Sequence, residues 1–170
     1  TNFQGTILDL GTGSGVIIIT LCIDNDKCIG IGMDNSINAL NLASENIAMH
    51  NLTNVKLKKF DWNYDNFDTK YEVIVANPPY LSIEEWYTTE PEVREFDPQN
   101  ALVAKNRGLG DIFKIIKHAV EHLTKDGVLA LEIGLGQKSS IVDKMKLHFY
   151  NVEIKKDLYQ RERFIFANKR

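Results

Sequence analysis

Five short apolar segments, each ending at Gly, Asp or Asn, recur in the chain before residue 135. They are four to eight residues long and rich in Ile, Val and Leu, which is typical of strands that are covered on both faces. The five segments are 6–10, 28–33, 55–60, 71–76 and 128–133. Helical patterns alternate with them at 36–50, 111–124 and 138–150. Alternating strands and helices indicate βαβ units and therefore a parallel sheet.

Two stretches do not follow this alternating pattern. Residues 16–19, Val-Ile-Ile-Ile, favour a strand by propensity because they are β-branched. They follow a glycine-rich loop directly, where the first crossover helix has to begin, so we predict a helix. Beyond Asn151 the pattern changes to two strands, 152–158 and 163–167, which we expect to pair antiparallel at the sheet edge. The prediction is one α/β domain over 1–170, with a mostly parallel seven-stranded sheet, an antiparallel edge strand and helices on both faces.

The composition excludes several classes of protein. Hydrophobic residues make up 44% and charged residues 25% of the 170, as in an ordinary globular domain. The longest apolar run falls far short of the roughly 20 residues that cross a membrane, so we expect no membrane contact. A net charge of -3 disfavours unaided wrapping of duplex nucleic acid. Cys22 and Cys28 are too few for a zinc site, and we predict reduced thiols in a cytoplasmic protein.

One histidine pair has a spacing that a metal could use. His118 and His122 stand at i and i+4 of a predicted helix. They share a face with Lys114 and Glu121, opposite the apolar stripe, so we predict a solvated surface and no metal.

The first apolar segment leads into a loop of the form Asp-x-Gly-x-Gly-x-Gly. Alternate glycines let the backbone turn tightly and let a ligand approach where a Cβ would clash. A Walker loop would need a lysine, and the dinucleotide fingerprint would need glycine where Val16 stands. Such a turn is structural about as often as it binds a ligand. Its residues are Asp9, Gly11, Thr12, Gly13, Ser14 and Gly15.

Acidic residues end the second and third segments. In an open parallel sheet, ligands bind beyond the carboxyl ends of the strands. Asp34 lies about 20 residues past the loop, where an acidic side chain can accept both ribose hydroxyls. Its alternative is to cap the helix that follows Ser36. Asp61 can receive an adenine amino group, and Trp62 can cover the ring or simply pack. Loop and acid together favour a nucleoside ligand.

The fourth segment ends in Asn77-Pro78-Pro79-Tyr80. Two prolines fix φ and remove two N–H donors, which leaves a stiff turn with carbonyls facing outward. The Asn77 amide oxygen and the Pro78 carbonyl can then accept both hydrogens of a planar NH2 group that lies against Tyr80. Such a nitrogen is a poor nucleophile, and gripping it contributes positioning and electrostatic stabilisation. The alternative is a proline turn with a packing tyrosine.

Together these motifs resemble the class I S-adenosylmethionine-dependent methyltransferases that act on amide or exocyclic amino nitrogens. Within that class the chain is most similar to the HemK/PrmC group, the peptide chain release factor glutamine N5-methyltransferases. Further matches to the group are 92–102, Gly108-Leu109, 131–137, 156–158 and Arg163. In place of the group's usual glycine near the end, this chain has Tyr159-Gln160.

The resemblance implies a Rossmann-like fold and a role for each motif. The loop, 11–15, would lie against S-adenosylmethionine, with Asp9 near its methionine part, Asp34 on the ribose, and Trp62 with Asp61 beside the adenine. Residues 77–80 would hold the glutamine amide of a Gly-Gly-Gln loop in a release factor, and Asn77 would also border the cofactor. The methyl group would pass from sulfonium to nitrogen without a metal, leaving S-adenosylhomocysteine.

Three further expectations concern the whole chain. The group usually carries an N-terminal helical domain, whereas only residues 1–6 precede the first strand's apolar core, so we expect a fragment or a chain that lost that domain, acting as a monomer. Residues 81–107 are long for a connection, and we predict a partly helical lid. Two alternatives stay open: methylation of an exocyclic amine of adenine or guanine in RNA or DNA, and a degenerate domain that binds without chemistry.

Overall fold

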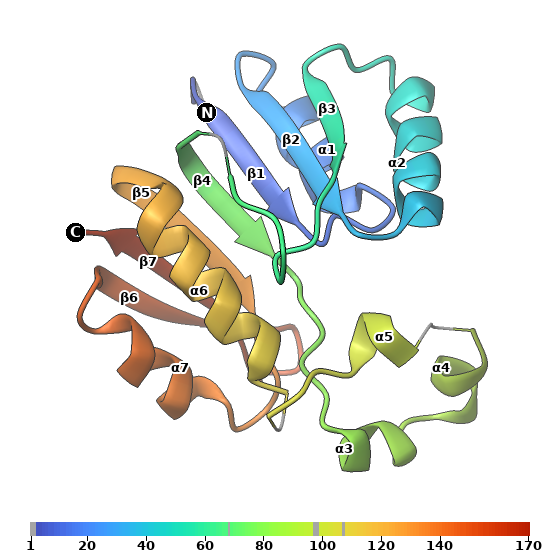
Figure 1. Ribbon diagram of the computed structural model, residues 1–170, viewed down its shortest axis with the longest axis vertical. Helices are drawn as coiled ribbons and strands as arrows, with labels where there is room; N and C mark the ends of the chain where they lie inside the picture. The colour runs from blue at the N-terminus through green and yellow to red at the C-terminus, as the bar shows by residue number, and fades with distance from the viewer. Residues whose placement is uncertain (1–2, 68, 97–98, 107) are drawn as a thin grey trace.

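A computed structural model describes residues 3–67, 69–96, 99–106 and 108–170. In these ranges seven strands form one sheet in the order β3-β2-β1-β4-β5-β7-β6 (Figure 1). The strands are β1 (Thr6–Leu10), β2 (Ile29–Asp34), β3 (Val55–Lys59), β4 (Tyr71–Ala76), β5 (Leu123–Glu132), β6 (Phe149–Lys156) and β7 (Glu162–Lys169). The first five pair in parallel, and β7 pairs antiparallel with both β5 and β6. The α/β sheet with an antiparallel pair at its edge is confirmed.

The described helices lie in the connections between these strands, and some of them cover the two faces of the sheet. They are α1 (Val16–Asp24), α2 (Ile37–Met49), α3 (Ile83–Tyr87), α4 (Pro91–Phe96), α5 (Gln99–Leu102), α6 (Gly110–His122) and α7 (Lys138–Met145). On one face α6 buries Ile112, Ile115, Ile116 and Ala119 against β1, β4 and β5. On the other face, α1 packs against Ile7 of β1. Successive side chains of a strand point to opposite faces, so Ile7 and Leu8 belong to different core layers.

The β-branched stretch 16–19 is the start of a helix, as predicted from its place after the loop. Ile18 and Ile19 are buried between the sheet and α2, and packing outweighs their propensity for strands. Gly15 precedes the helix with φ of 82°. A Cβ there would come within 3.2 Å of Ala43 in α2, so glycine permits both the turn and the close approach.

Element boundaries differ from the prediction in the second half of the chain. Helix α6 ends at His122 rather than at 124, because Leu123 already pairs with Tyr71 in the sheet. Helix α7 ends at Met145 rather than at 150, and Phe149 begins β6. Phe149 fits a helical stripe with Met145, but it is buried as the strand partner of Lys169. An apolar residue four positions after Met145 is compatible with a continued helix or with a new strand, so the pattern alone does not distinguish them.

The segment between β4 and α6 is partly helical, as predicted, and carries α3, α4 and α5 beyond the carboxyl ends of the strands (Figure 1). Its two ends are tied together, since Leu81 pairs with Val103 and its carbonyl accepts a hydrogen bond from Ala104 at 3.0 Å. Asp97, Pro98 and Arg107 of this segment lie outside the described residues. None of the helices in the described ranges combines the length and the apolar character that a membrane crossing requires.

Candidate active site

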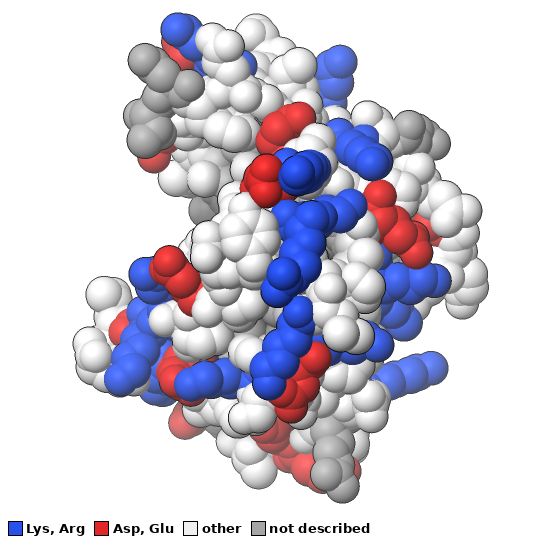
Figure 2. Space-filling view, turned by 90° about the vertical axis from the view of Figure 1, so that its left-hand side faces the viewer, with Lys and Arg blue, Asp and Glu red and all other residues white. Residues whose placement is uncertain are grey.

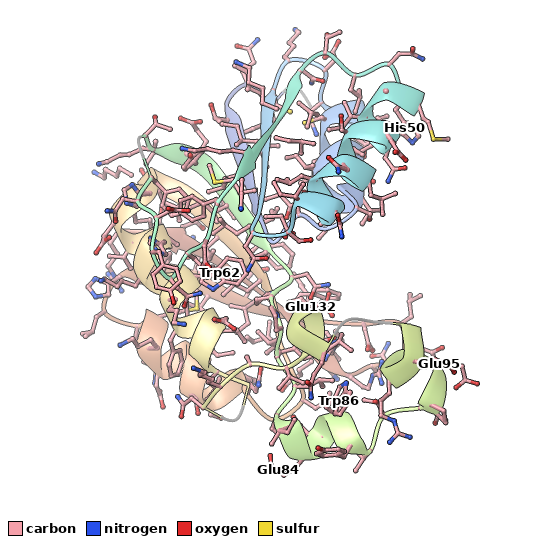
Figure 3. The ribbon with its side chains drawn as sticks, turned by 45° about the vertical axis from the view of Figure 1, so that its right-hand side comes forward. His50, Trp62, Glu84, Trp86, Glu95 and Glu132 are labelled. Carbon is pink, nitrogen blue, oxygen red and sulfur yellow. The ribbon has the colours of Figure 1, made fainter. Side chains whose placement is uncertain are left out.

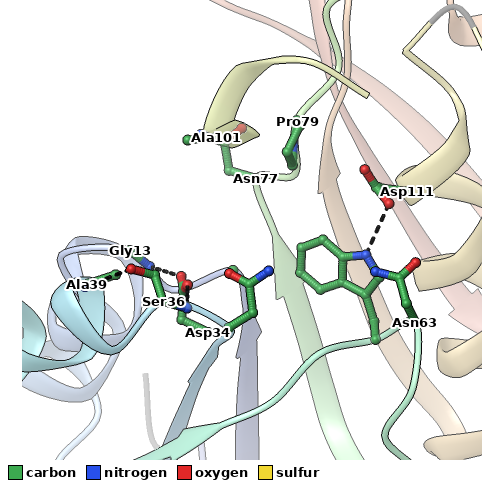
Figure 4. A pocket seen from close by; sticks show the side chains of 12 residues that line it. Gly13, Asp34, Ser36, Ala39, Asn63, Asn77, Pro79, Ala101 and Asp111 are labelled. Carbon is green, nitrogen blue, oxygen red and sulfur yellow. Dashed lines mark hydrogen bonds between the residues drawn. The ribbon is translucent and has the colours of Figure 1, made fainter. Parts of the chain in front are cut away.

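A pocket of about 560 Å³ opens beyond the carboxyl ends of β1, β2 and β4. Strand β1 lies between β2 and β4, so this is the switch point at which open α/β sheets bind ligands. Figure 4 shows Asp34 and Asp111 on opposite sides of the pocket. The lining residues are Gly11, Gly13, Asp34, Asn35, Ser36, Ala39, Trp62, Asn63, Asn77, Pro79, Ala101 and Asp111. Ala101 belongs to α5, so the segment predicted to be a lid does border the pocket.

Asp34 holds the glycine loop and the start of α2 together at the pocket wall. Its Oδ2 accepts a hydrogen bond from the Gly13 N–H at 2.9 Å, and its Oδ1 accepts one from the Ser36 N–H at 2.9 Å. The Ser36 side chain, rather than Asp34, caps α2 by accepting from the Ala39 N–H. Each carboxylate oxygen can accept a further bond, so Asp34 stays able to receive ligand hydroxyls.

The first part of the motif lies beneath the pocket. Asp9 is fully buried and accepts a hydrogen bond from the Thr12 hydroxyl at 2.7 Å. Burial raises the pKa of the Asp9 carboxyl from 3.8 to about 6, against the opposing effect of the Thr12 bond. Asp9, Thr12, Ser14 and Gly15 do not line the pocket. Asp9 therefore supports the loop from below, and its predicted contact with a cofactor stays a prediction.

Trp62 lies across the pocket, whereas its neighbour Asp61 does not line it. The indole Nε1 donates to Asp111 Oδ1 at 3.1 Å, and a Cβ on Gly11 would touch the indole at 3.5 Å. Asp61 Oδ1 accepts from the backbone N–H of Asn63 at 2.8 Å and from its side-chain amide at 2.6 Å. Asn63 lines the pocket where the sequence suggested Asp61. For Asp111 the sequence pattern predicts only the beginning of a helix, whereas the structure places it at the pocket.

The turn after β4 contributes Asn77 and Pro79 to the pocket, with Asn77 exposed. Pro78 is buried and Tyr80 is half-buried. The Tyr80 hydroxyl donates to Glu132 Oε1 at 3.2 Å and accepts from Arg163 Nη2 at 2.5 Å. Burial and the negative charge of Glu132 raise the pKa of the Tyr80 phenol, and Arg163 opposes them. Tyr80 is thus anchored away from the pocket lining.

Two further residues fix the backbone of this turn. The Gln137 side chain donates to the Tyr80 carbonyl at 2.9 Å and accepts from the Gly134 N–H at 2.8 Å. Gly108 has φ of 77°, and a Cβ there would overlap the Tyr80 carbonyl oxygen. From the sequence, Glu132, Gln137 and Gly108 are known only as positions that match the HemK/PrmC group, and the sequence predicts no contact for them. The structure brings them together around one residue.

The histidine pair on α6 does not form the solvated face that we predicted. His118 and His122 are half-buried, and the Phe67 ring centroid lies 4.9 Å from each imidazole centroid. The cause is the connection between β3 and β4, which folds back over this end of α6. Helix periodicity alone cannot reveal such a cover.

The comparisons with known proteins bear directly on this site. The family model described as the methyltransferase small domain matches residues 1–90, which contain the glycine loop, Asp34 and the turn after β4. The chain belongs to the methyltransferase small domain family. Two curated relatives are named release factor glutamine methyltransferase. The one from Buchnera aphidicola subsp. Schizaphis graminum is 36% identical over 99% of this chain, and the one from Lactococcus lactis subsp. lactis is 37% identical over 94%.

This member of the methyltransferase small domain family spans 61% and 59% of those two relatives' own lengths. Among solved structures, a ribosomal protein L11 methylase from Lactobacillus delbrueckii subsp. bulgaricus superposes with a TM-score of 0.71 at 20% identity, covering 99% of this chain and 71% of that one. That likeness establishes the class I methyltransferase fold.

Proposed function

We propose that the protein transfers a methyl group from S-adenosylmethionine to the side-chain amide nitrogen of the glutamine in the Gly-Gly-Gln motif of peptide chain release factors. The observation that carries the proposal is that Asn77 opens into the same pocket as Asp34. Methylation of a nitrogen by a nucleoside cofactor requires two things at one pocket. One is a turn that can hydrogen-bond the accepting amide, and the other is an acceptor for the ribose hydroxyls. The relatives named for this activity align over nearly the whole chain.

The residues of the pocket fit S-adenosylmethionine. A volume of about 560 Å³ lies within the range of small-molecule sites. Asp34 would accept the ribose hydroxyls, Trp62 would lie against the adenine, and the loop at Gly11 and Gly13 would border the methionine part. Gly13 has φ of 56° with nothing within 4 Å of a Cβ, so bare backbone faces open space there. Bound there, S-adenosylmethionine supplies an electrophilic methyl group on its sulfonium sulfur and becomes S-adenosylhomocysteine.

The chain's own groups would orient the accepting nitrogen. The Asn77 amide oxygen and the Pro78 carbonyl would accept the two N–H hydrogens of the glutamine amide, which turns the face of the nitrogen toward the methyl group. The same bonds would stabilise the positive charge that develops on nitrogen as the C–N bond forms and the methyl–sulfonium bond breaks, and the nitrogen would then release one hydrogen as a proton to water. Tyr80, held by Glu132 and Arg163, would fix the end of the turn.

The nucleic-acid alternative would use the same turn on an exocyclic amine. The relatives' names favour the protein substrate. The face shown in Figure 2 has a band of Lys and Arg along its middle with Asp and Glu beside it, and the net charge of the chain is -3. Dense phosphate contacts would need a clustered excess of basic residues. On this proposal the protein works in the cytoplasm, as a monomer, on release factors.

The test offers methyl-labelled S-adenosylmethionine with a release factor, RNA and DNA in parallel reactions. Label in the release factor alone is expected, and Asn77→Ala should abolish it. Asn41→Ala changes an exposed asparagine of α2 that does not line the pocket and should leave labelling unchanged. Label in RNA or DNA would replace the proposal by the alternative, and no label in any of them would contradict it.

A further inference from the structure

The two half-buried histidines of α6 are each bonded to a backbone carbonyl of the connection that covers them. His118 Nε2 lies 3.0 Å from the Trp62 carbonyl oxygen, and His122 Nδ1 lies 3.3 Å from that of Thr69. A carbonyl oxygen only accepts, so both of these ring nitrogens must carry hydrogens. In the neutral imidazoles, the lone pairs are therefore on His118 Nδ1 and His122 Nε2.

Both of those nitrogens lack a strong partner. Among the described residues, His118 Nδ1 is buried with no hydrogen-bond partner. His122 Nε2 lies 3.9 Å from Glu121 Oε2, which is too long for a hydrogen bond. Buried polar atoms without a partner are rare in folded proteins and call for an explanation. Here the buried atom without a partner is His118 Nδ1, whose lone pair can bind a cation.

The third member of the group is the carboxylate of Glu121. One ligand atom from each of His118, Glu121 and His122 lies within 4.8 Å of the others. The histidines are oriented by the carbonyls of Trp62 and Thr69, as metal-bound histidines usually are by a carbonyl or carboxylate on the second nitrogen. Phe67 packs against both imidazoles and limits their motion.

We propose that His118, Glu121 and His122 form a binding site for a divalent transition metal ion. Two imidazoles and one carboxylate suit Zn²⁺, Ni²⁺ or Cu²⁺ rather than Mg²⁺ or Ca²⁺, which prefer oxygen ligands. Water would complete the coordination. The site is separate from the methyl-transfer chemistry proposed above, which needs no metal. All three ligands belong to α6, and the opposite imidazole nitrogens bond the β3–β4 connection, which carries Trp62 into the pocket (Figure 3).

The first test is calorimetric titration of the chelator-treated protein with zinc chloride. One equivalent of Zn²⁺ should bind. His122→Gln and Glu121→Gln should each weaken binding by at least about tenfold, since even residues that only orient ligands cost that much. His50→Gln is the matched control, because His50 is exposed at the end of α2, and it should bind Zn²⁺ as the native chain does. Circular dichroism melts establish that the variants are folded.

The second test separates this site from the buried thiols Cys22 and Cys28, whose sulfurs lie 3.4 Å apart. Cobalt(II) should give a spectrum of nitrogen and oxygen ligation without a thiolate charge-transfer band, and His118→Gln/His122→Gln should remove it. Absence of stoichiometric binding, equal binding by the double variant, or a thiolate band that Cys22→Ser removes would each overturn the proposal.

Discussion

The guanidinium carbon of Arg163 lies 4.6 Å from the centre of the Tyr80 ring, and Nη2 of Arg163 donates to the Tyr80 hydroxyl. Glu132 Oε1 accepts from both groups, from Arg163 at 2.6 Å and from Tyr80 at 3.2 Å. The Tyr80 ring is therefore fixed by the end of β5 and the start of β7, strands that β4 precedes by more than forty residues. This arrangement positions the turn that begins at Asn77.

Arg163→Lys should reduce the rate of methyl transfer while leaving the dissociation constant of S-adenosylmethionine unchanged. Lysine keeps the charge but can neither stack on the ring nor bond both oxygens in the same geometry. A displacement of about 1 Å at the turn can cost about a hundredfold in rate. Steady-state assays with calorimetry measure both quantities. Arg161→Lys alters an exposed arginine paired with Asp157 and should leave both unchanged. Loss of cofactor affinity in Arg163→Lys would contradict the positioning role.

Gly108→Ala should destabilise the protein more than Gly136→Ala. Both glycines have φ near 78°, and an alanine there costs about 1–2 kcal/mol from backbone strain. Nothing lies within 4 Å of a Cβ on Gly136, whereas a Cβ on Gly108 overlaps the Tyr80 carbonyl. Urea denaturation gives the two free energies of unfolding. Gly108→Ala should also slow methyl transfer. Equal destabilisation by the two changes would show that the clash is relieved without cost.

Asp9→Asn should stabilise the folded protein at neutral pH. Burial raises the pKa of Asp9 from 3.8 in the unfolded chain to about 6, so the folded state binds this proton more tightly. The resulting stability is present below pH 3.8 and is lost as the pH rises through about 6. At neutral pH the ionised carboxyl then costs about 3 kcal/mol. Asparagine has no charge to bury, and its amide oxygen can still accept from Thr12.

Urea denaturation across this pH range measures the effect of Asp9→Asn. The native chain should lose stability between pH 4 and 6 relative to the variant, and Asp26→Asn, at an exposed position, should follow the native chain. If the stability of Asp9→Asn changed with pH as that of the native chain does, Asp9 would not be the source of the pH dependence.

Trp62 should report cofactor binding by its fluorescence. In Trp86→Phe, which leaves Trp62 as the single tryptophan, S-adenosylhomocysteine should change the emission. In Trp62→Phe, which leaves Trp86 of α3, the emission should stay constant. Trp62→Ala should weaken cofactor binding by about tenfold, since stacking of a base on an aromatic ring contributes about 1–3 kcal/mol. A response that follows Trp86 instead would place the adenine elsewhere.

The pocket could be predicted from the sequence because parallel strands end at one edge of a sheet. The residues after β1, β2 and β4 meet there whatever the details of packing, so Gly13, Asp34 and Asn77 come together. The helix at 16–19 was predicted for a related reason, since a crossover is required at that point and outweighs local propensity.

The support of the site could not be predicted in the same way. Arg163 reaches Tyr80 because β7 enters the sheet beside β5 in the opposite direction, and hydrophobic periodicity carries no information about strand order. The environment of His118 depends on a connection that folds over α6, which the helix pattern does not encode. The Asp61 side chain accepts a hydrogen bond from the Asn63 backbone N–H in an Asx turn. This local bond directs the carboxylate away from the pocket.

On the proposed function, the turn beginning at Asn77 presents a glutamine amide to the cofactor. Peptide mass mapping of a release factor treated with the protein and S-adenosylmethionine tests it most directly. A gain of one methylene mass is expected on the glutamine of the Gly-Gly-Gln motif, absent with Asn77→Ala and retained with Asn41→Ala. A methyl group on another residue, or one still added by Asn77→Ala, would contradict it.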